Sequence, residues 1–135
     1  MTYLLDTNAC VHSLRRRGNR LVRQRLGSRL PGDIVLCSVV VAELFFGAEG
    51  SSNPVGGRQQ AEAFAAAYRS LPFEDAAARV YARIRHNLES RGLPIGENDY
   101  MIAAITLANN LILVTHNTKE FSRVPGLVIE DWEIP

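Results

Sequence analysis

Five short apolar segments, separated by longer stretches with helical spacing, constrain this chain more than any other feature of its sequence. Most are rich in Leu, Ile and Val and end at a polar residue or a turn, which is typical of strands buried on both faces. The expected strands cover residues 3–5, 34–37, 71–73, 111–114 and 127–129. Pro72 places the third strand at an edge. Because strands and helices alternate, we expect a central parallel sheet between two helical layers, a three-layer α/β/α sandwich.

The segments between the strands carry the periodicity and the end signals of helices. Ser38 and Asp99 are candidate N-caps, and Gly92 ends the longest helix. The Gly- and Ser-rich stretch 47–57 is expected to be the one flexible loop. The expected helices cover residues 7–17, 21–26, 39–46, 58–69, 75–91, 99–107 and 117–121.

Length and composition indicate one ordinary globular domain. The chain has 135 residues, 47% hydrophobic and 21% charged, so we expect residues 1–135 to form a single domain. No apolar run is long enough for a transmembrane helix, and the first residues do not resemble a secretory signal. The two cysteines, Cys10 and Cys37, lack the spacing of a zinc site. We therefore expect a reduced, cytoplasmic protein.

Basic residues are unevenly distributed along a chain whose net charge is only +1. Seven arginines lie between positions 15 and 29, whereas Lys119 is the only lysine. Guanidinium groups bind phosphate in a bidentate manner, which ammonium groups do not. Arg15, Arg16 and Arg17, at the end of the first expected helix, are therefore candidates for phosphate contacts. A solvated helix face explains the cluster equally well, so both interpretations stay open.

Polar residues follow the expected strands at the points where ligands bind in parallel α/β sheets. Asp6 directly follows the first strand, and Asn117 follows the fourth. Asp99 opens a late helix. Each of these residues could equally be a helix cap, and Asn117 with Glu120 has the spacing of a capping box.

Glu43 is more informative, because apolar residues flank it on both sides. A carboxylate in such surroundings loses hydration and needs a partner, either an arginine or a metal ion. With Asp6, Asp99 and Asn117 it predicts a cluster of oxygen ligands whose carboxylates repel one another. A hard divalent cation relieves this repulsion, and oxygen ligands favour Mg²⁺ or Mn²⁺ over zinc. From the residues alone, nuclease and phosphotransfer chemistry both stay open.

Four motifs contain these residues. They are 3–8 (YLLDTN), 38–44 (SVVVAEL), 92–99 (GLPIGEND) and 114–117 (VTHN), and the close at 130–132 (EDW) also fits. In order and spacing they resemble the VapC-type toxins of the PIN-domain ribonuclease family, and the resemblance covers nearly the whole chain.

The resemblance implies a PIN-like fold and an endoribonuclease that depends on Mg²⁺ or Mn²⁺. It also implies an RNA substrate, a cognate antitoxin that inhibits the enzyme, and a toxin homodimer. By the same resemblance, Asp6, Glu43 and Asp99 correspond to the catalytic carboxylates that bind the metal in this family. Asn117 stands where many PIN nucleases have Asp; its amide oxygen can hold a ligand or a water molecule but supplies no charge.

Neighbouring residues are expected to support this set. Thr7 can hydrogen-bond near Asp6, and Thr115 near Asn117, to orient ligands or water. Glu120 is a possible auxiliary carboxylate.

The other expectations concern RNA and the partner. Arg15–Arg17 are the preferred residues for RNA phosphates, and His116 is expected to flank the pocket without being catalytic. Leu44, Phe45 and Phe46 cannot all point into one core, so at least one is expected to be exposed beside an antitoxin groove. The helices from Arg58 onward could instead cover this patch.

Two other functions share some of these sequence features. A receiver-like or phosphohydrolase domain needs a lysine after a late strand, and Lys119 lies in a turn two residues past Asn117, which fits poorly. A PIN module that binds RNA or a protein without cutting is the second, and the three intact carboxylates argue against it.

Overall fold

A five-stranded parallel sheet forms the centre of the computed structural model, which describes residues 1–135. The strands lie in the order β3-β2-β1-β4-β5, so β1 is central, and every neighbouring pair is parallel. The carboxyl ends of all strands therefore meet at one edge of the sheet. The strands are β1 (Tyr3–Leu5), β2 (Ile34–Cys37), β3 (Arg69–Leu71), β4 (Ile112–Val114) and β5 (Ile129–Glu130).

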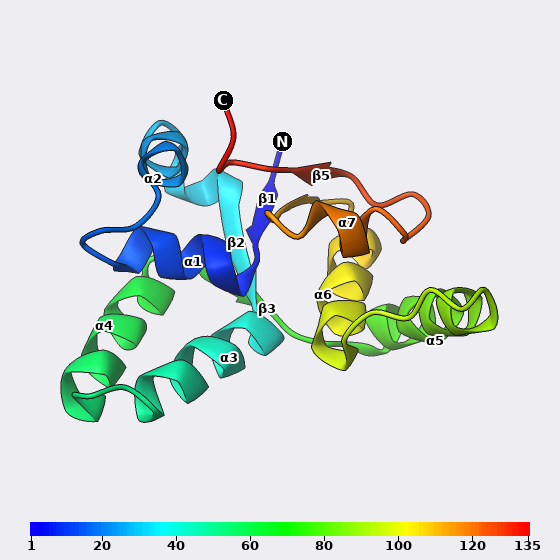
Figure 1. Ribbon diagram of the computed structural model, residues 1–135, viewed down its shortest axis with the longest axis horizontal. Coiled ribbons are helices and arrows are strands. Elements are labelled where there is room, and N and C mark those ends of the chain that lie inside the picture. The colour runs from blue at the N-terminus through cyan, green and yellow to red at the C-terminus, as the bar shows by residue number, and fades with distance from the viewer.

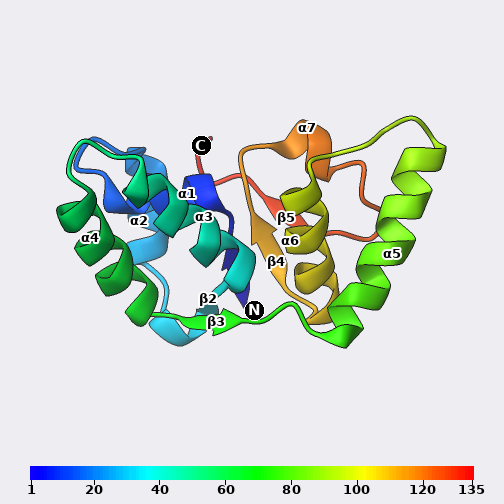
Figure 2. The same cartoon turned by 90° about the horizontal axis from the view of Figure 1, so that it is seen from below.

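Helices cover both sides of this sheet, which confirms the expected α/β/α sandwich. Figure 2 shows α1 to α4 on one side of the strands and α5 to α7 on the other. In Figure 1, α3 and α4 form a hairpin at the lower left. The helices are α1 (Thr7–Leu14), α2 (Arg20–Gly27), α3 (Ser38–Glu49), α4 (Pro54–Ala66), α5 (Asp75–Ser90), α6 (Glu97–Ala108) and α7 (Thr118–Phe121).

The core lies on both faces of the three inner strands. Leu4, Leu36 and Leu113, from neighbouring strands, have no exposed surface. Helix α6 is apolar around most of its circumference and is buried, as expected for such a helix. Helix α5 packs on it through one apolar face, which includes Ile84 and Leu88. None of the helices combines the length and apolarity needed to cross a lipid bilayer.

The expected flexible loop at 47–57 is wrong. Helix α3 continues to Glu49 and α4 already begins at Pro54, so only four residues connect them. Pro54 occupies the first turn, where its missing N–H costs nothing. The Asn53 side chain accepts a hydrogen bond from the Gly56 amide (3.1 Å) and caps the helix. Packing of α3 against α4 outweighs the low helix propensity of the glycines.

Two expected caps are also wrong. Cys37 and Gly96 occupy the N-cap positions of α3 and α6, and neither makes a side-chain cap bond. Ser38 lies inside α3, where its hydroxyl donates to the Leu71 carbonyl (3.4 Å). Asp99 lies inside the first turn of α6, so its carboxylate is not used as a cap.

The remaining differences concern element ends. Helix α1 ends at Leu14 because Arg15 is extended (φ −78°, ψ 137°), so the arginines at 15–17 lie beyond the helix. Strand β3 is at the sheet edge as expected, but it begins two residues earlier, at Arg69. Strand β5 pairs only through Ile129 and Glu130.

Candidate active site: an acidic cleft at the carboxyl ends of β1 and β4

Adjacent parallel strands bring the predicted residues together. Asp6 follows β1 and Asn117 follows β4, and the Asp6 amide continues the pairing by donating to the Val114 carbonyl (3.0 Å). Glu43 comes from α3, and Asp99 from α6. These residues line one cleft of about 190 Å³. Its complete lining is Asp6, Thr7, Asn8, Glu43, Asp99, Ile102, Asn117 and Phe121.

Asp6 is both a helix cap and a cleft residue, two roles that looked like alternatives in the sequence. Its Oδ1 accepts a hydrogen bond from the Ala9 amide (2.8 Å) at the start of α1. The side chain is buried, and this burial raises its pKa. Hydrogen bonds from Thr115 and the Ala9 amide lower the pKa in part, whereas the charges of Glu133 and Glu43 raise it further. The cap consists of a single amide bond to Oδ1, so capping does not use up the carboxylate.

Asp99 is half-buried, and its pKa is raised to about 6. Burial is the largest cause, followed by the charges of Glu120, Glu43 and Asp6. Its position depends on a small neighbour, because a Cβ on Gly96 would lie 3.3 Å from Asp99 Oδ2.

Glu43 reaches the cleft from α3 and is held by α1. The Thr7 hydroxyl donates to Glu43 Oε1 (2.6 Å). Thr7 was expected to bond near Asp6, but as the first residue of α1 it faces Glu43 across the cleft mouth. This bond joins the helix that follows β1 to the helix that follows β2.

Asn117 is held by a turn rather than by a capping box. Its φ and ψ (−79°, 58°) and the bond from the Thr118 amide to the His116 carbonyl (2.8 Å) define an inverse γ-turn. The Asn117 amide donates to Thr115 Oγ1 (3.0 Å), as expected for Thr115. Its side-chain Nδ2 donates to Glu120 Oε2 (3.2 Å). A carboxylate can only accept, so this bond identifies Oδ1 as the free amide atom.

The donors in the cleft fit a hard divalent cation. The lining has carboxylates, amides and a hydroxyl, and it contains no Lys, Arg or His. Lys119, which a phosphohydrolase would need, is exposed and does not line the cleft. However, no three acidic, His or Cys side chains already form a ready-made metal-binding group. Glu43 engages the Thr7 hydroxyl, so binding of a cation requires its side chain to share or change that partner.

Comparison with known proteins agrees with this geometry. The sequence model of the PIN domain matches residues 3–127. The chain belongs to the PIN-domain family, among the VapC ribonucleases. It is 33% identical to ribonuclease VapC2 of Rickettsia felis over 98% of this chain and 99% of that protein. It is 37% identical to a tRNA(fMet)-specific endonuclease VapC of Shigella flexneri over 98% of both chains.

Solved structures of related PIN domains have the same fold. In the crystal structure of VapBC2 from Rickettsia felis bound to promoter DNA, one chain matches with a TM-score of 0.87 and 32% identity, over 98% of this chain and 99% of that one. FitAcB from Neisseria gonorrhoeae matches with a TM-score of 0.87 and 28% identity, over 97% and 98% of the two chains.

The arginines of this PIN domain have diverse surroundings. Arg15, Arg16 and Arg17 are exposed, and Arg15 lines a groove that reaches Glu43. The other arginines of the cluster include structural ones: the Arg25 guanidinium donates to the Asp131 carbonyl, and that of Arg29 stacks on aromatic rings.

Sequence reasoning missed the C-terminal residues beside the site. Asp131 and Glu133 pair with two histidines, His116 and His12, that showed no shared spacing. The only signal in the sequence was the EDW motif at 130–132, and its spacing does not indicate a role for either carboxylate. Asn8, from the first motif, also lines the cleft.

Asp99→Asn should stabilise the metal-free protein at pH 7. The pKa of Asp99 is raised from 3.8 to about 6 in the folded protein. The protonated carboxyl therefore contributes to folding stability below the pKa of the unfolded chain, and this contribution is lost as the pH rises through about 6. After allowance for solvent screening, we expect a gain of roughly 1 kcal/mol at pH 7 that vanishes near pH 4. Urea unfolding in EDTA at both pH values measures it. Asp75→Asn, which changes an exposed aspartate on α5, is the control. A wild type more stable than Asp99→Asn at pH 7 would show that the Asp99 charge does not destabilise the metal-free fold.

Proposed function

We propose that this chain is a Mg²⁺- or Mn²⁺-dependent endoribonuclease that acts as the toxin of a toxin–antitoxin pair. The observation that carries the proposal is a cleft with three carboxylates and no cationic side chain. Curated relatives are named ribonucleases or a tRNA(fMet)-specific endonuclease, which supports RNA as the substrate. One or two bound ions would activate water and stabilise the in-line displacement at phosphorus.

Each cleft residue has a distinct part in this proposal. Asp6 would hold the ion through its carboxylate, which the Ala9 amide orients by its bond to Oδ1. Asp99 and Glu43 complete the carboxylate set from the two flanking helices. Asn117 can orient a water molecule through Oδ1, because Glu120 holds its Nδ2. It adds no charge, so the set favours one strongly held ion over two.

Removing the metal or one carboxylate tests this function. EDTA should abolish RNA cleavage, and added Mg²⁺ or Mn²⁺ should restore it. Asp6→Asn and Asp99→Asn should each lower kcat about 10²-fold or more, because they remove charge at the ion. Asp75→Asn, an exposed aspartate, should cut at the wild-type rate. Wild-type rates in both cleft variants would refute the catalytic assignment.

The exposed Arg15, Arg16 and Arg17 are proposed to contact RNA phosphates. They follow α1, the helix that begins at the Asp6 cap, and Arg15 shares a groove lining with Glu43. Phosphates next to the scissile bond can therefore reach them along this side of the cleft.

Charge reversal at all three arginines should weaken RNA association and flatten its salt dependence. Each lost phosphate contact removes about 0.7 from the slope of log K against log salt for single strands. Binding is measured in an Asp6→Asn background to prevent cleavage. Arg79→Glu with Arg83→Glu, on the exposed side of α5, is the control. An unchanged slope would assign Arg15–Arg17 to another surface function.

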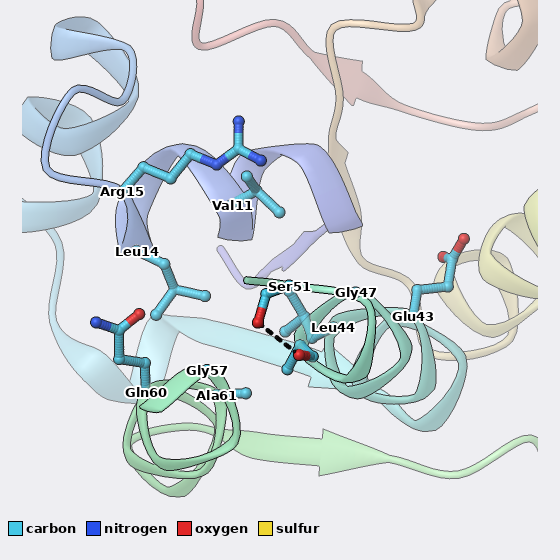
Figure 3. Close-up of a pocket in the computed structure, with 11 residues that line it drawn as sticks. Val11, Leu14, Arg15, Glu43, Leu44, Gly47, Ser51, Gly57, Gln60 and Ala61 are labelled. Carbon is cyan, nitrogen blue, oxygen red and sulfur yellow. Dashed lines mark hydrogen bonds between the residues drawn. The ribbon is translucent and has the colours of Figure 1, made fainter. Parts of the chain in front are cut away.

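The antitoxin is proposed to bind the groove between α1, α3 and α4. Figure 3 shows Leu14 and Leu44 facing this space. Glu43 lies at the right-hand end of the lining and Arg15 at the upper left. The groove has a volume of about 210 Å³, and a helical segment with apolar residues suits it. Solved relatives include VapBC complexes, which supports an antitoxin partner. A basic side chain entering past Glu43 would compete with the metal.

Phe46 is the exposed apolar residue that the sequence predicted, at 81% exposure. It does not line the groove, whereas the buried Leu44 does. Helix α4 packs along α3 and leaves Phe46 uncovered. We propose that Phe46 belongs to the interface of the expected toxin homodimer, since exposed large apolar residues commonly mark interfaces.

Filling the groove should relieve inhibition without unfolding the toxin. A Cβ on Gly47 meets no atom within 4 Å, so Gly47→Leu fits the helix and projects into the groove. We expect an unchanged kcat at saturating RNA and at least 10-fold weaker inhibition by the antitoxin in a cleavage titration. Gly27→Leu, at an equally open helical position of α2, should be inhibited normally. Full inhibition of Gly47→Leu would remove the groove assignment.

A further inference from the structure

The last residues of the chain are anchored beside the acidic cleft. Trp132 is buried, its ring lies 5.4 Å from that of Tyr3, and the guanidinium of Arg29 stacks over both rings. The Trp132 indole N–H donates to Glu130 Oε1 (3.0 Å). The Arg25 guanidinium donates to the backbone carbonyl of Asp131, between Glu130 and Trp132 (3.1 Å). The backbone of 130–132 is therefore fixed independently of any contact with the cleft.

Asp131, within this anchored segment, holds His116. Its Oδ2 lies 2.9 Å from His116 Nδ1, and its Oδ1 accepts from the Glu133 amide (2.9 Å). The Asp131 side chain is only 10% exposed, whereas that of His116 is 57% exposed. A carboxylate can only accept, so Nδ1 of His116 carries the hydrogen. The anchored, buried Asp131 therefore orients the exposed His116 ring, not the reverse.

Glu133 extends the same network to α1. Its Oε1 lies 3.4 Å from His12 Nε2, and its Oε2 lies 3.9 Å from His116 Nδ1. His12 Nδ1 accepts from the Asn19 amide (3.1 Å), so the hydrogen of the neutral ring is on Nε2. With both nitrogens engaged, His12 is not free to ligate a metal. The cluster instead bridges α1 and the β4–α7 loop through polar contacts of the two histidines with Asp131 and Glu133.

The residue that depends on this bridge is Asn117. It is the central residue of the inverse γ-turn, and His116 supplies the carbonyl that closes the turn. The His116 ring has no hydrogen-bond or ion-pair partner other than Asp131 and Glu133. Without them, the His116 ring beside the turn would be free to rotate in solvent.

We propose that Asp131 is a positioning residue, which holds Asn117 in its place in the cleft through the His116 ring, with Glu133 as the second link to α1. This rests on the proposed nuclease function only for its effect on catalysis. The bridge acts through hydrogen-bond geometry, so what matters at position 131 is a hydrogen-bonding group toward both His116 and the Glu133 amide rather than a charge.

Three variants of the full-length protein test the bridge by steady-state RNA cleavage. Asp131→Ala removes the acceptor and should lower kcat about 10-fold with KM within twofold, the effect typical of losing a group behind a catalytic ligand. Asp131→Asn keeps a hydrogen-bonding atom on each side, because Oδ1 can accept from the Glu133 amide while Nδ2 donates to Nδ1 of the other His116 tautomer, so it should retain most of kcat. Glu62→Ala removes an exposed carboxylate on α4, outside the bridge, and it should leave kcat unchanged.

Amide hydrogen exchange at Asn117 and Thr118 provides a readout that does not need activity. Exchange there should accelerate at least 10-fold in Asp131→Ala, but not in Asp131→Asn or Glu62→Ala. His116→Ala removes the same hydrogen bond by deleting its exposed partner. If Asp131→Ala fails to fold, His116→Ala takes its place in the comparison. A wild type that cuts no RNA would refute the proposed function, and exchange would then decide the bridge alone. Unchanged exchange, or an Asp131→Asn as impaired as Asp131→Ala, would overturn it.

Discussion

The parallel pairing of β1 with β2 and β4 is the constraint on which the rest of the structure depends. It places the ends of three buried strands side by side, so that residues far apart in the chain open onto one cleft. The bond from the Asp6 amide to the Val114 carbonyl carries the ladder one residue beyond β1, into the site itself. Asp6 and Asn117 are thus held by the sheet, while Glu43 and Asp99 come from the helices that flank it.

This arrangement has an electrostatic cost. The pKa values of Asp6 and Asp99 are raised, chiefly by burial and then by neighbouring carboxylates. Neutral donors offset part of the cost: Thr7 bonds Glu43, and the Ala9 amide bonds Asp6. None of them supplies a positive charge. Much of the repulsion between the carboxylates is therefore left uncompensated within the protein, and the proposed divalent cation would relieve it.

The apolar surfaces and the acidic cleft are linked through α3. The same helix buries Leu44 toward α4, exposes Phe46, and presents Glu43 at the cleft. A partner bound along α3 therefore lies within reach of the cleft carboxylates. The C-terminal segment approaches the cleft from another direction, through His116. The proposed inhibition and the proposed positioning thus act on different residues of one site.

Local sequence signals predicted the strands, the fold class and the acidic set, because buried strands and isolated carboxylates are conspicuous in a short chain. They failed where packing overrides local preference. The glycines at 47–57 looked like a loop, yet contact with α4 keeps Gly47 helical. Ser38 and Asp99 looked like caps, yet each helix begins one or more residues earlier.

The sequence by itself determined which residues are candidates for the chemistry: Asp6, Glu43, Asp99 and Asn117 stand out against apolar surroundings. Only the tertiary structure decided their partners. Thr7 pairs with a glutamate 36 positions away, and His12 and His116 meet at Glu133. Such contacts depend on strand order and on the path of the C-terminus across the sheet. Sequence periodicity reports which face of an element is buried, but not which distant element covers it.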